Sequence, residues 1–155
     1  MPKAQEIKTG AIPTANKTIR HSQTPEQVDH LRPAWGFRLI DLGLNDWNWN
    51  QVDYTAWIRL LKQLQSFESL TWGEIKLQTS GKRKGTRHHF IGLEKLEKAA
   101  KDRWIELHLD DYGEVYSLRM EGKLRIYGIR EGRVLHLVWY DPHHGDTRGV
   151  CPSLP

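Results

Sequence analysis

The residues of this sequence that are best suited to chemistry gather toward its C-terminal end. Two arginines, Arg119 and Arg125, flank a predicted tight turn, and the chain then reaches Tyr140, His143 and His144. Arginine holds phosphate through paired N–H groups, and imidazole exchanges protons near neutral pH. The five side chains therefore predict a site that holds an RNA phosphate and moves protons. The alternative is that these residues lie on a sheet face that is exposed to water and binds nothing.

A second basic feature lies upstream, between residues 82 and 89. Four fixed positive charges and two histidines occur there, at Lys82, Arg83, Lys84, Arg87, His88 and His89. Such a segment attracts nucleic acid through its charge, and its glycine allows a close backbone approach. We predict that these residues and Lys123 bind RNA. A solvated surface loop is the alternative.

The two histidine pairs do not predict a metal site. Adjacent side chains point apart in a strand, so a pair at neighbouring positions seldom holds one ion. The sequence contains no spacing typical of zinc ligands, no phosphate loop, no dinucleotide motif and no nucleophile elbow. We therefore expect neither a metal nor another cofactor.

Charge and composition favour an anionic partner. The chain of 155 residues has a formal net charge of +4 and eight further histidines. The single cysteine, Cys151, excludes an internal disulfide and favours a reducing compartment. No segment has the apolar length of a signal peptide or a membrane span. We expect a cytoplasmic protein with no membrane partner.

These residues have to be positioned by one α+β domain, predicted at residues 34–145. Residues 1–33 contain four prolines and no apolar periodicity, which predicts a disordered basic arm, and residues 146–155 form a tail. The predicted elements before the sheet are a strand from Trp35 to Leu42, an amphipathic helix capped by Asp53 and ending near Phe67, a short helical turn from Trp72 to Leu77 with a Thr71–Glu74 capping box, and a second amphipathic helix carrying Leu93, Leu96, Ala100 and Trp104.

From residue 105 the apolar period changes to two, which predicts strands at 105–109, 115–120, 124–129 and 134–140. The connections are short and contain glycine, so neighbouring strands should be antiparallel. We expect the two helices to cover one face of this meander and to leave the other face open. On that open face Lys123, Arg125 and Tyr127 should lie together, opposite to Leu124 and Ile126.

The residues of the last strands also carry a family resemblance. Segments 116–129 and 134–140, followed by His143 and His144, resemble the end of the RelE superfamily of bacterial toxins, particularly its YoeB and HigB branches. Chains of that superfamily have an arginine-bearing strand, a hairpin, and a last apolar strand that closes on histidine or tyrosine.

The resemblance implies a RelE-like fold and a toxin-like endoribonuclease that cleaves messenger RNA on the ribosome. It also implies an antitoxin protein as a partner. By this resemblance, Arg125 holds the scissile phosphate, and Tyr140, His143 or His144 is the terminal acid–base group. From the residues themselves, we expect Arg119 to help Arg125 stabilise the phosphorane charge. The reaction would need no metal.

Two other functions are compatible with the same sequence. A non-catalytic module would use the basic loop 80–89 and the arm to hold nucleic acid or an acidic protein. A scaffold subunit would meet a partner through surface tryptophans, since the chain has seven. Of these, Trp47 and Trp49 are expected either at the surface or packed on the helix that follows.

Overall fold

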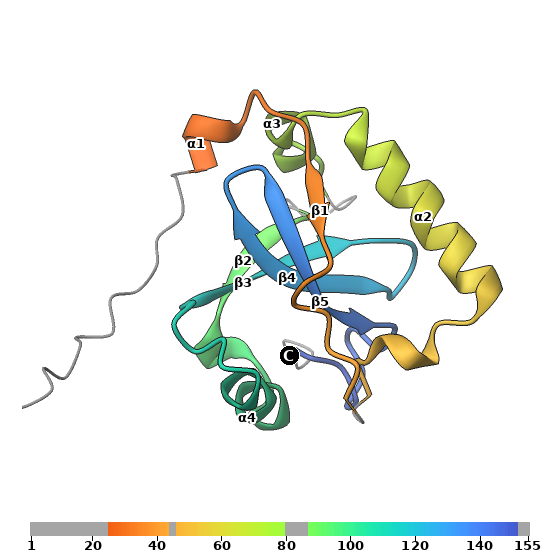
Figure 1. The fold of residues 1–155 in the computed structure, drawn as a ribbon, viewed down its shortest axis with the longest axis vertical. Coiled ribbons are helices and arrows are strands. Elements are labelled where there is room, and N and C mark those ends of the chain that lie inside the picture. The colour runs from red at the N-terminus through yellow and green to blue at the C-terminus, as the bar shows by residue number, and fades with distance from the viewer. Residues whose placement is uncertain (1–24, 44–45, 80–86, 152–155) are drawn as a thin grey trace, which may run out of the picture.

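A computed structural model describes residues 25–43, 46–79 and 87–151 of the chain. Its helices are α1 (Pro25–Val28), α2 (Tyr54–Glu68), α3 (Trp72–Lys76) and α4 (Lys98–Glu106), with short 3-10 turns at Trp49–Gln51 and Leu93–Lys95. Its strands are β1 (Ala34–Gly36), β2 (His89–Gly92), β3 (Glu114–Arg119), β4 (Arg125–Glu131) and β5 (Val134–Asp141). The predicted α+β class is confirmed (Figure 1).

The strands form one sheet in the order β1-β5-β4-β3-β2. Strands β2 to β5 are antiparallel to their neighbours, whereas β1 runs parallel to β5. The two predicted hairpins β3–β4 and β4–β5 are confirmed, and the glycines of their turns, Gly122 and Gly132, have positive φ angles of 56° and 58°. These turns set the register of the three central strands.

The predicted strand at 105–109 is wrong, because this segment ends α4. The amide of His108 donates to the carbonyl of Ile105, and the amide of Leu109 donates to that of Trp104. With His108 at a φ of 57°, this is the pattern of a Schellman helix end. The place beside β3 is taken instead by β2, which begins at His89, the last residue of the predicted basic loop 80–89.

The predicted first strand is also shorter than expected. Only Ala34–Gly36 pairs with β5, and a turn then closes with a hydrogen bond from the amide of Ile40 to the carbonyl of Phe37. The amide of Asp41 bonds to the carbonyl of Val138, which brings the chain back against β5. The alternation that predicted a longer strand therefore belongs partly to a turn.

Helices cover both faces of the sheet, so the predicted open face is wrong. Residues of α2 and α3 pack with Leu118, Ile126 and Leu137 on one face. On the other face Ala100 and Trp104 of α4 pack with Val115, Tyr127, Ile129 and Trp139. The central strands are apolar on both sides, as β5 illustrates with the run Leu-Val-Trp-Tyr, and a sheet of that kind requires cover on both faces.

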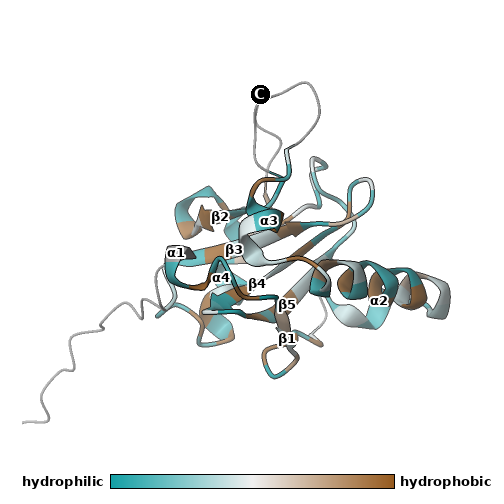
Figure 2. Cartoon of the chain, turned by 90° about the horizontal axis from the view of Figure 1, so that it is seen from above, coloured by the Kyte–Doolittle hydropathy of each residue, from teal (hydrophilic) through white to brown (hydrophobic). Residues whose placement is uncertain are grey.

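The predicted helix caps are confirmed. The Asp53 side chain accepts a hydrogen bond from the amide of Ala56, and Thr71 and Glu74 form both bonds of a capping box. Seen from above, α2 alternates between hydrophobic and hydrophilic residues along its length (Figure 2). None of the described helices combines the length and hydrophobicity that crossing a membrane requires.

Trp47 and Trp49 are buried, with exposed fractions of 6% and 8%. Trp49 meets Trp57 of α2 edge to face at 6.2 Å, which agrees with packing on the following helix. Trp47 packs against Trp139 at 5.4 Å. Because neither ring lies at the surface, the scaffold hypothesis loses the two tryptophans on which it depended.

Candidate active site

The two arginines that the sequence singled out are neighbours on one face of the sheet. Arg119 of β3 is the register partner of Arg125 of β4, which in turn pairs with Asp141 of β5. Directly paired residues project their side chains from the same face. Arg87 lies two residues before β2, close enough for its charge to lower the pKa of Arg125. We call Arg87, Arg119 and Arg125 the arginine row.

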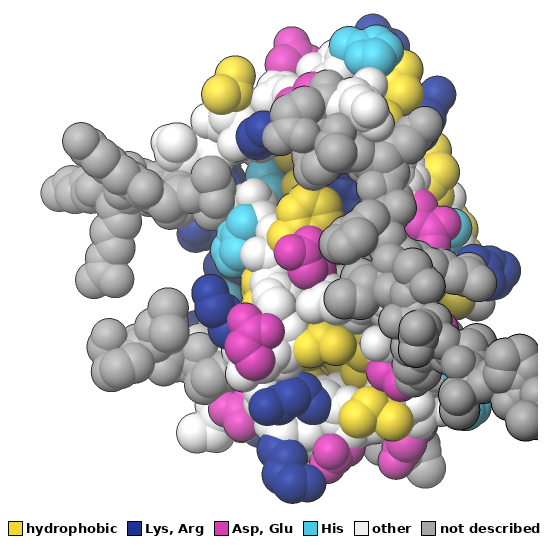
Figure 3. Space-filling model, turned by 90° about the vertical axis from the view of Figure 1, so that its left-hand side faces the viewer, with side chains coloured by type: hydrophobic (Ala, Val, Ile, Leu, Met, Phe, Trp, Pro, Cys, Tyr) yellow, Lys and Arg dark blue, Asp and Glu magenta, His cyan; other side chains and the backbone are white. Residues whose placement is uncertain are grey.

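A second line of polar side chains lies next to the arginine row on the same face. His89 pairs with Ser117, and Ser117 pairs with Tyr127. The hydroxyl of Tyr127 lies 3.4 Å from Nδ1 of His144, which comes from the segment after β5. On the side of the molecule that carries β2 and α4, histidine side chains border lysine or arginine side chains (Figure 3).

The arginine row is partly buried. Arg125 is only 8% exposed, and its Nη1 donates to the carbonyls of Gly122 and Leu124. Burial, followed by the charge of Arg119, lowers its pKa. Among the described residues, neither Arg119 nor Arg125 is within ion-pair distance of a carboxylate. Positive charges gathered in this way favour the binding of an anion.

Asp141 is the carboxylate nearest in register to the row, but its oxygens are already used. They accept hydrogen bonds from the amide of His143 at 2.8 Å and from the amide of Val150 at 2.9 Å. The side chain is fully buried, and burial raises its pKa. Asp141 therefore holds the segment that carries His143 and His144 against the sheet.

His144 is the imidazole best placed for proton transfer. Burial, followed by the charges of Arg125 and Arg119, lowers its pKa to about 4. The ring is therefore neutral at pH 7 and can accept a proton. Burial raises the pKa of Tyr127, so the neighbouring phenol keeps its proton and can form a hydrogen bond with the ring. A neutral base thus lies beside the guanidinium groups.

The other predicted acid–base residues lie elsewhere. Tyr140 pairs with Ile126 on the opposite face and packs against Trp49 at 5.6 Å, so it does not join the arginine row. The ring of His143 accepts a hydrogen bond from Arg148 through Nδ1 at 3.2 Å. Its contacts are therefore with the segment beyond β5 and not with the row.

Of the residues predicted to bind RNA, Arg87 belongs to the arginine row, His89 lies next to it, and Lys123 is exposed in the β3–β4 turn. His88 does not lie at the surface. Its Nδ1 accepts from the amide of Arg119 at 3.0 Å, which makes its Nε2 the donor to Gln78 at 2.8 Å. Burial, followed by Arg87, lowers its pKa to about 4, so it is a neutral structural residue.

The remaining predicted RNA-binding residues, Lys82, Arg83 and Lys84, lie outside the described residues. Two residues of the site, Ser117 and Asp141, were missing from the prediction, and Tyr127 was predicted on the face of Arg125 but was given no role. Ser117 becomes a neighbour of the arginines only when the strand register is known. Asp141 directly follows the apolar run of β5, and an acidic residue next to two histidines was the signal that could have drawn attention to it.

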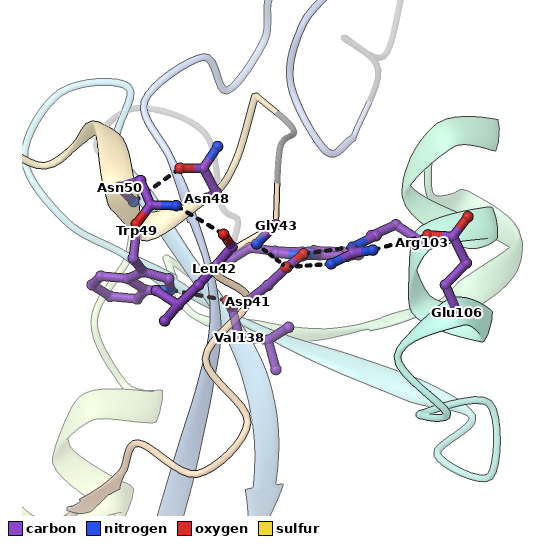
Figure 4. A network of polar contacts seen from close by, with 10 residues as sticks. Asp41, Leu42, Gly43, Asn48, Trp49, Asn50, Arg103, Glu106 and Val138 are labelled. Atoms are coloured by element: carbon purple, nitrogen blue, oxygen red, sulfur yellow. Dashed lines mark hydrogen bonds and ion pairs between the residues drawn. The ribbon is translucent and has the colours of Figure 1, made fainter.

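A second buried carboxylate has a structural role. Asp41, 1% exposed, accepts hydrogen bonds from Nη2 and Nε of Arg103, from Nε1 of Trp139 and from the amide of Gly43, at 2.7 to 3.0 Å. Arg103 also reaches Glu106 on its own helix (Figure 4). Both oxygens of Asp41 are therefore saturated, and the network connects α4, β5 and the segment after β1.

The described residues contain no group of three metal-ligating side chains. The similarity to RelE-like toxins over the last strands stays a prediction from sequence. Comparison with models of protein families, with characterised proteins and with solved structures finds no match.

Proposed function

We propose that this protein is a metal-independent endoribonuclease whose active site is the arginine row together with His144 and His89. The observation that carries the proposal is the side-by-side placement of Arg119 and Arg125, without a carboxylate partner among the described residues, next to a neutral imidazole. Guanidinium groups in a partly buried site are suited to hold phosphate oxygens and to stabilise charge that develops on them.

The proposed reaction uses the 2′-hydroxyl of the RNA as its nucleophile. His144 accepts the hydroxyl proton while the 2′-oxygen bonds to phosphorus, and the bond from phosphorus to the 5′-oxygen breaks. His89, on the same face, gives a proton to the departing 5′-oxygen. The products are a 2′,3′-cyclic phosphate and a 5′-hydroxyl, and the arginine row neutralises the phosphorane. Transfer of a proton between the two histidines through water restores the starting state.

The finer parts of the proposal come from the resemblance to RelE-like toxins. They are messenger RNA as the substrate, the ribosome as the place of cleavage, an antitoxin as a partner, and the cytoplasm as the location. The non-catalytic alternative, a module that only binds nucleic acid, uses the same positive charges.

Replacing His144 by alanine is expected to slow RNA cleavage by about 10²- to 10⁴-fold, since the proton acceptor is lost. The measurement is the single-turnover rate of the purified protein on a single-stranded RNA in the presence of a metal chelator. His30→Ala, which alters an exposed histidine far along the chain from the site, is the matched control and should keep the wild-type rate. RNA that the wild type binds but leaves intact would favour the non-catalytic module.

The pH dependence of cleavage provides a separate test. A base with a pKa of about 4 is deprotonated above that pH, so kcat/KM should not decline between pH 7 and about pH 5. Below about pH 4 it should fall tenfold per pH unit. Arg119→Gln removes one of the charges that lower the His144 pKa, so the acid limb should move to higher pH. An acid limb near pH 6.5 in the wild type would contradict the assignment of His144 as the base.

A further inference from the structure

The positive charge of the arginine row exceeds what one RNA phosphodiester neutralises. Each guanidinium stays charged at any physiological pH. The neutral His144 adds no charge, and Asp141 is the one carboxylate among the causes that affect the pKa of Arg125. Even with Asp141 fully ionised, the row keeps an excess of two positive charges. A phosphodiester carries one negative charge.

The row also offers hydrogen-bond donors that lack acceptors. The Nε groups of Arg87 and Arg119 are buried and have no partner in the part of the chain that the structure describes. A buried donor without an acceptor costs free energy, and a ligand with several oxygens would remove that cost. Arg125 uses Nη1 on two carbonyls, which orients its planar group within the row.

We propose that the arginine row binds the dianionic phosphate monoester at the end of an RNA strand in preference to an internal phosphodiester. A monoester carries a charge of about −1.5 to −2 at pH 7 and presents three terminal oxygens, whereas a diester has two and a single charge. This inference concerns the same site as the proposed function. A phosphorane is also a dianion, so the charge that binds a monoester would also stabilise the transition state of cleavage.

The test compares a monoester ligand and a diester ligand with the full-length protein. One is a nucleoside 3′-monophosphate, and the other is a dinucleoside monophosphate whose 2′-O-methyl group prevents cleavage. Calorimetry at pH 7.5 and constant ionic strength should give at least tenfold tighter binding of the monoester. The preference should shrink as the pH falls below about 6, where the monoester becomes a monoanion.

Arg119→Gln should remove most of this preference, and Arg87→Gln is a second variant in case the first fails to fold. Arg133→Gln, which alters an exposed arginine in the β4–β5 turn, should leave it unchanged. Equal affinities of the wild type for the two ligands would overturn the inference, as would equal losses in Arg119→Gln and Arg133→Gln. If the protein prefers the monoester but does not cleave RNA, the inference stands and the endoribonuclease proposal fails. If it cleaves RNA without this preference, the endoribonuclease proposal stands and the inference fails.

Discussion

Replacing Asp41 by alanine is expected to lower the free energy of unfolding by about 2 to 4 kcal/mol, because buried donors lose their acceptor while the partly exposed Arg103 can be hydrated. The change leaves the guanidinium of Arg103 without its bidentate partner and leaves Nε1 of the buried Trp139 without an acceptor. It also frees the amide of Gly43 (Figure 4). Urea unfolding followed by tryptophan fluorescence measures the effect directly, because two of the rings involved in the adjoining core are tryptophans.

Two variants separate the charge of Asp41 from its shape. Asp41→Asn keeps the size and one acceptor oxygen, so it should retain part of the lost stability. Asp102→Ala breaks only the exposed i,i+4 pair with Lys98 and should leave the unfolding midpoint unchanged. If Asp41→Ala and Asp102→Ala unfold at the same urea concentration, the network does not hold α4 to β5.

The local features of the fold could be predicted from sequence because each has a short-range cause. Asp53 caps α2 through an amide three residues away, and Thr71 and Glu74 complete a capping box within one turn. Gly122 supplies the positive φ that closes the β3–β4 hairpin. Interactions between residues a few positions apart, such as caps and tight turns, can be predicted from the sequence alone.

The features that failed depend on contacts between distant segments. Residues 105–109 alternate as a strand does, but Trp104 packs in the core and the helix extends to Glu106. β2 has only two apolar residues, Phe90 and Ile91, and becomes a strand because β3 offers it an edge. The Asp41 network joins positions 62 and 98 residues apart, which no local pattern reveals.

The candidate site was predicted in part for the same reason. The alternation of side chains in the strand correctly predicted that Arg125 and Tyr127 share one face. The register of the β3–β4 hairpin places Arg119 beside Arg125. Tyr140 was misplaced because it follows the register shift of β5, where it pairs with Ile126 on the other face. The position of His144 depends on Asp141, which bonds the amides of the following segment.

Replacing Arg119 by glutamine is expected to slow RNA cleavage by about 10²- to 10³-fold, the loss typical of removing one donor that stabilises the transition state. Arg119 is a better target than Arg125, because Arg125 also bonds the carbonyls of the β3–β4 turn, so that its removal would alter the fold as well as the charge. The measurement is the single-turnover rate with saturating protein, which separates the chemical step from binding.

Arg119→Lys distinguishes the two ways in which this arginine can act. Lysine keeps the positive charge but not the planar guanidinium group. If paired hydrogen bonds to the phosphorane are needed, Arg119→Lys should bind RNA more tightly than Arg119→Gln but cleave it little faster. Lys123→Gln removes an exposed charge from the β3–β4 turn and should change salt-dependent binding without changing the saturated rate. If Arg119→Gln and Lys123→Gln weaken binding equally and both leave the saturated rate intact, the arginines attract RNA only through their charge, and the non-catalytic module replaces the endoribonuclease as the better account of this surface.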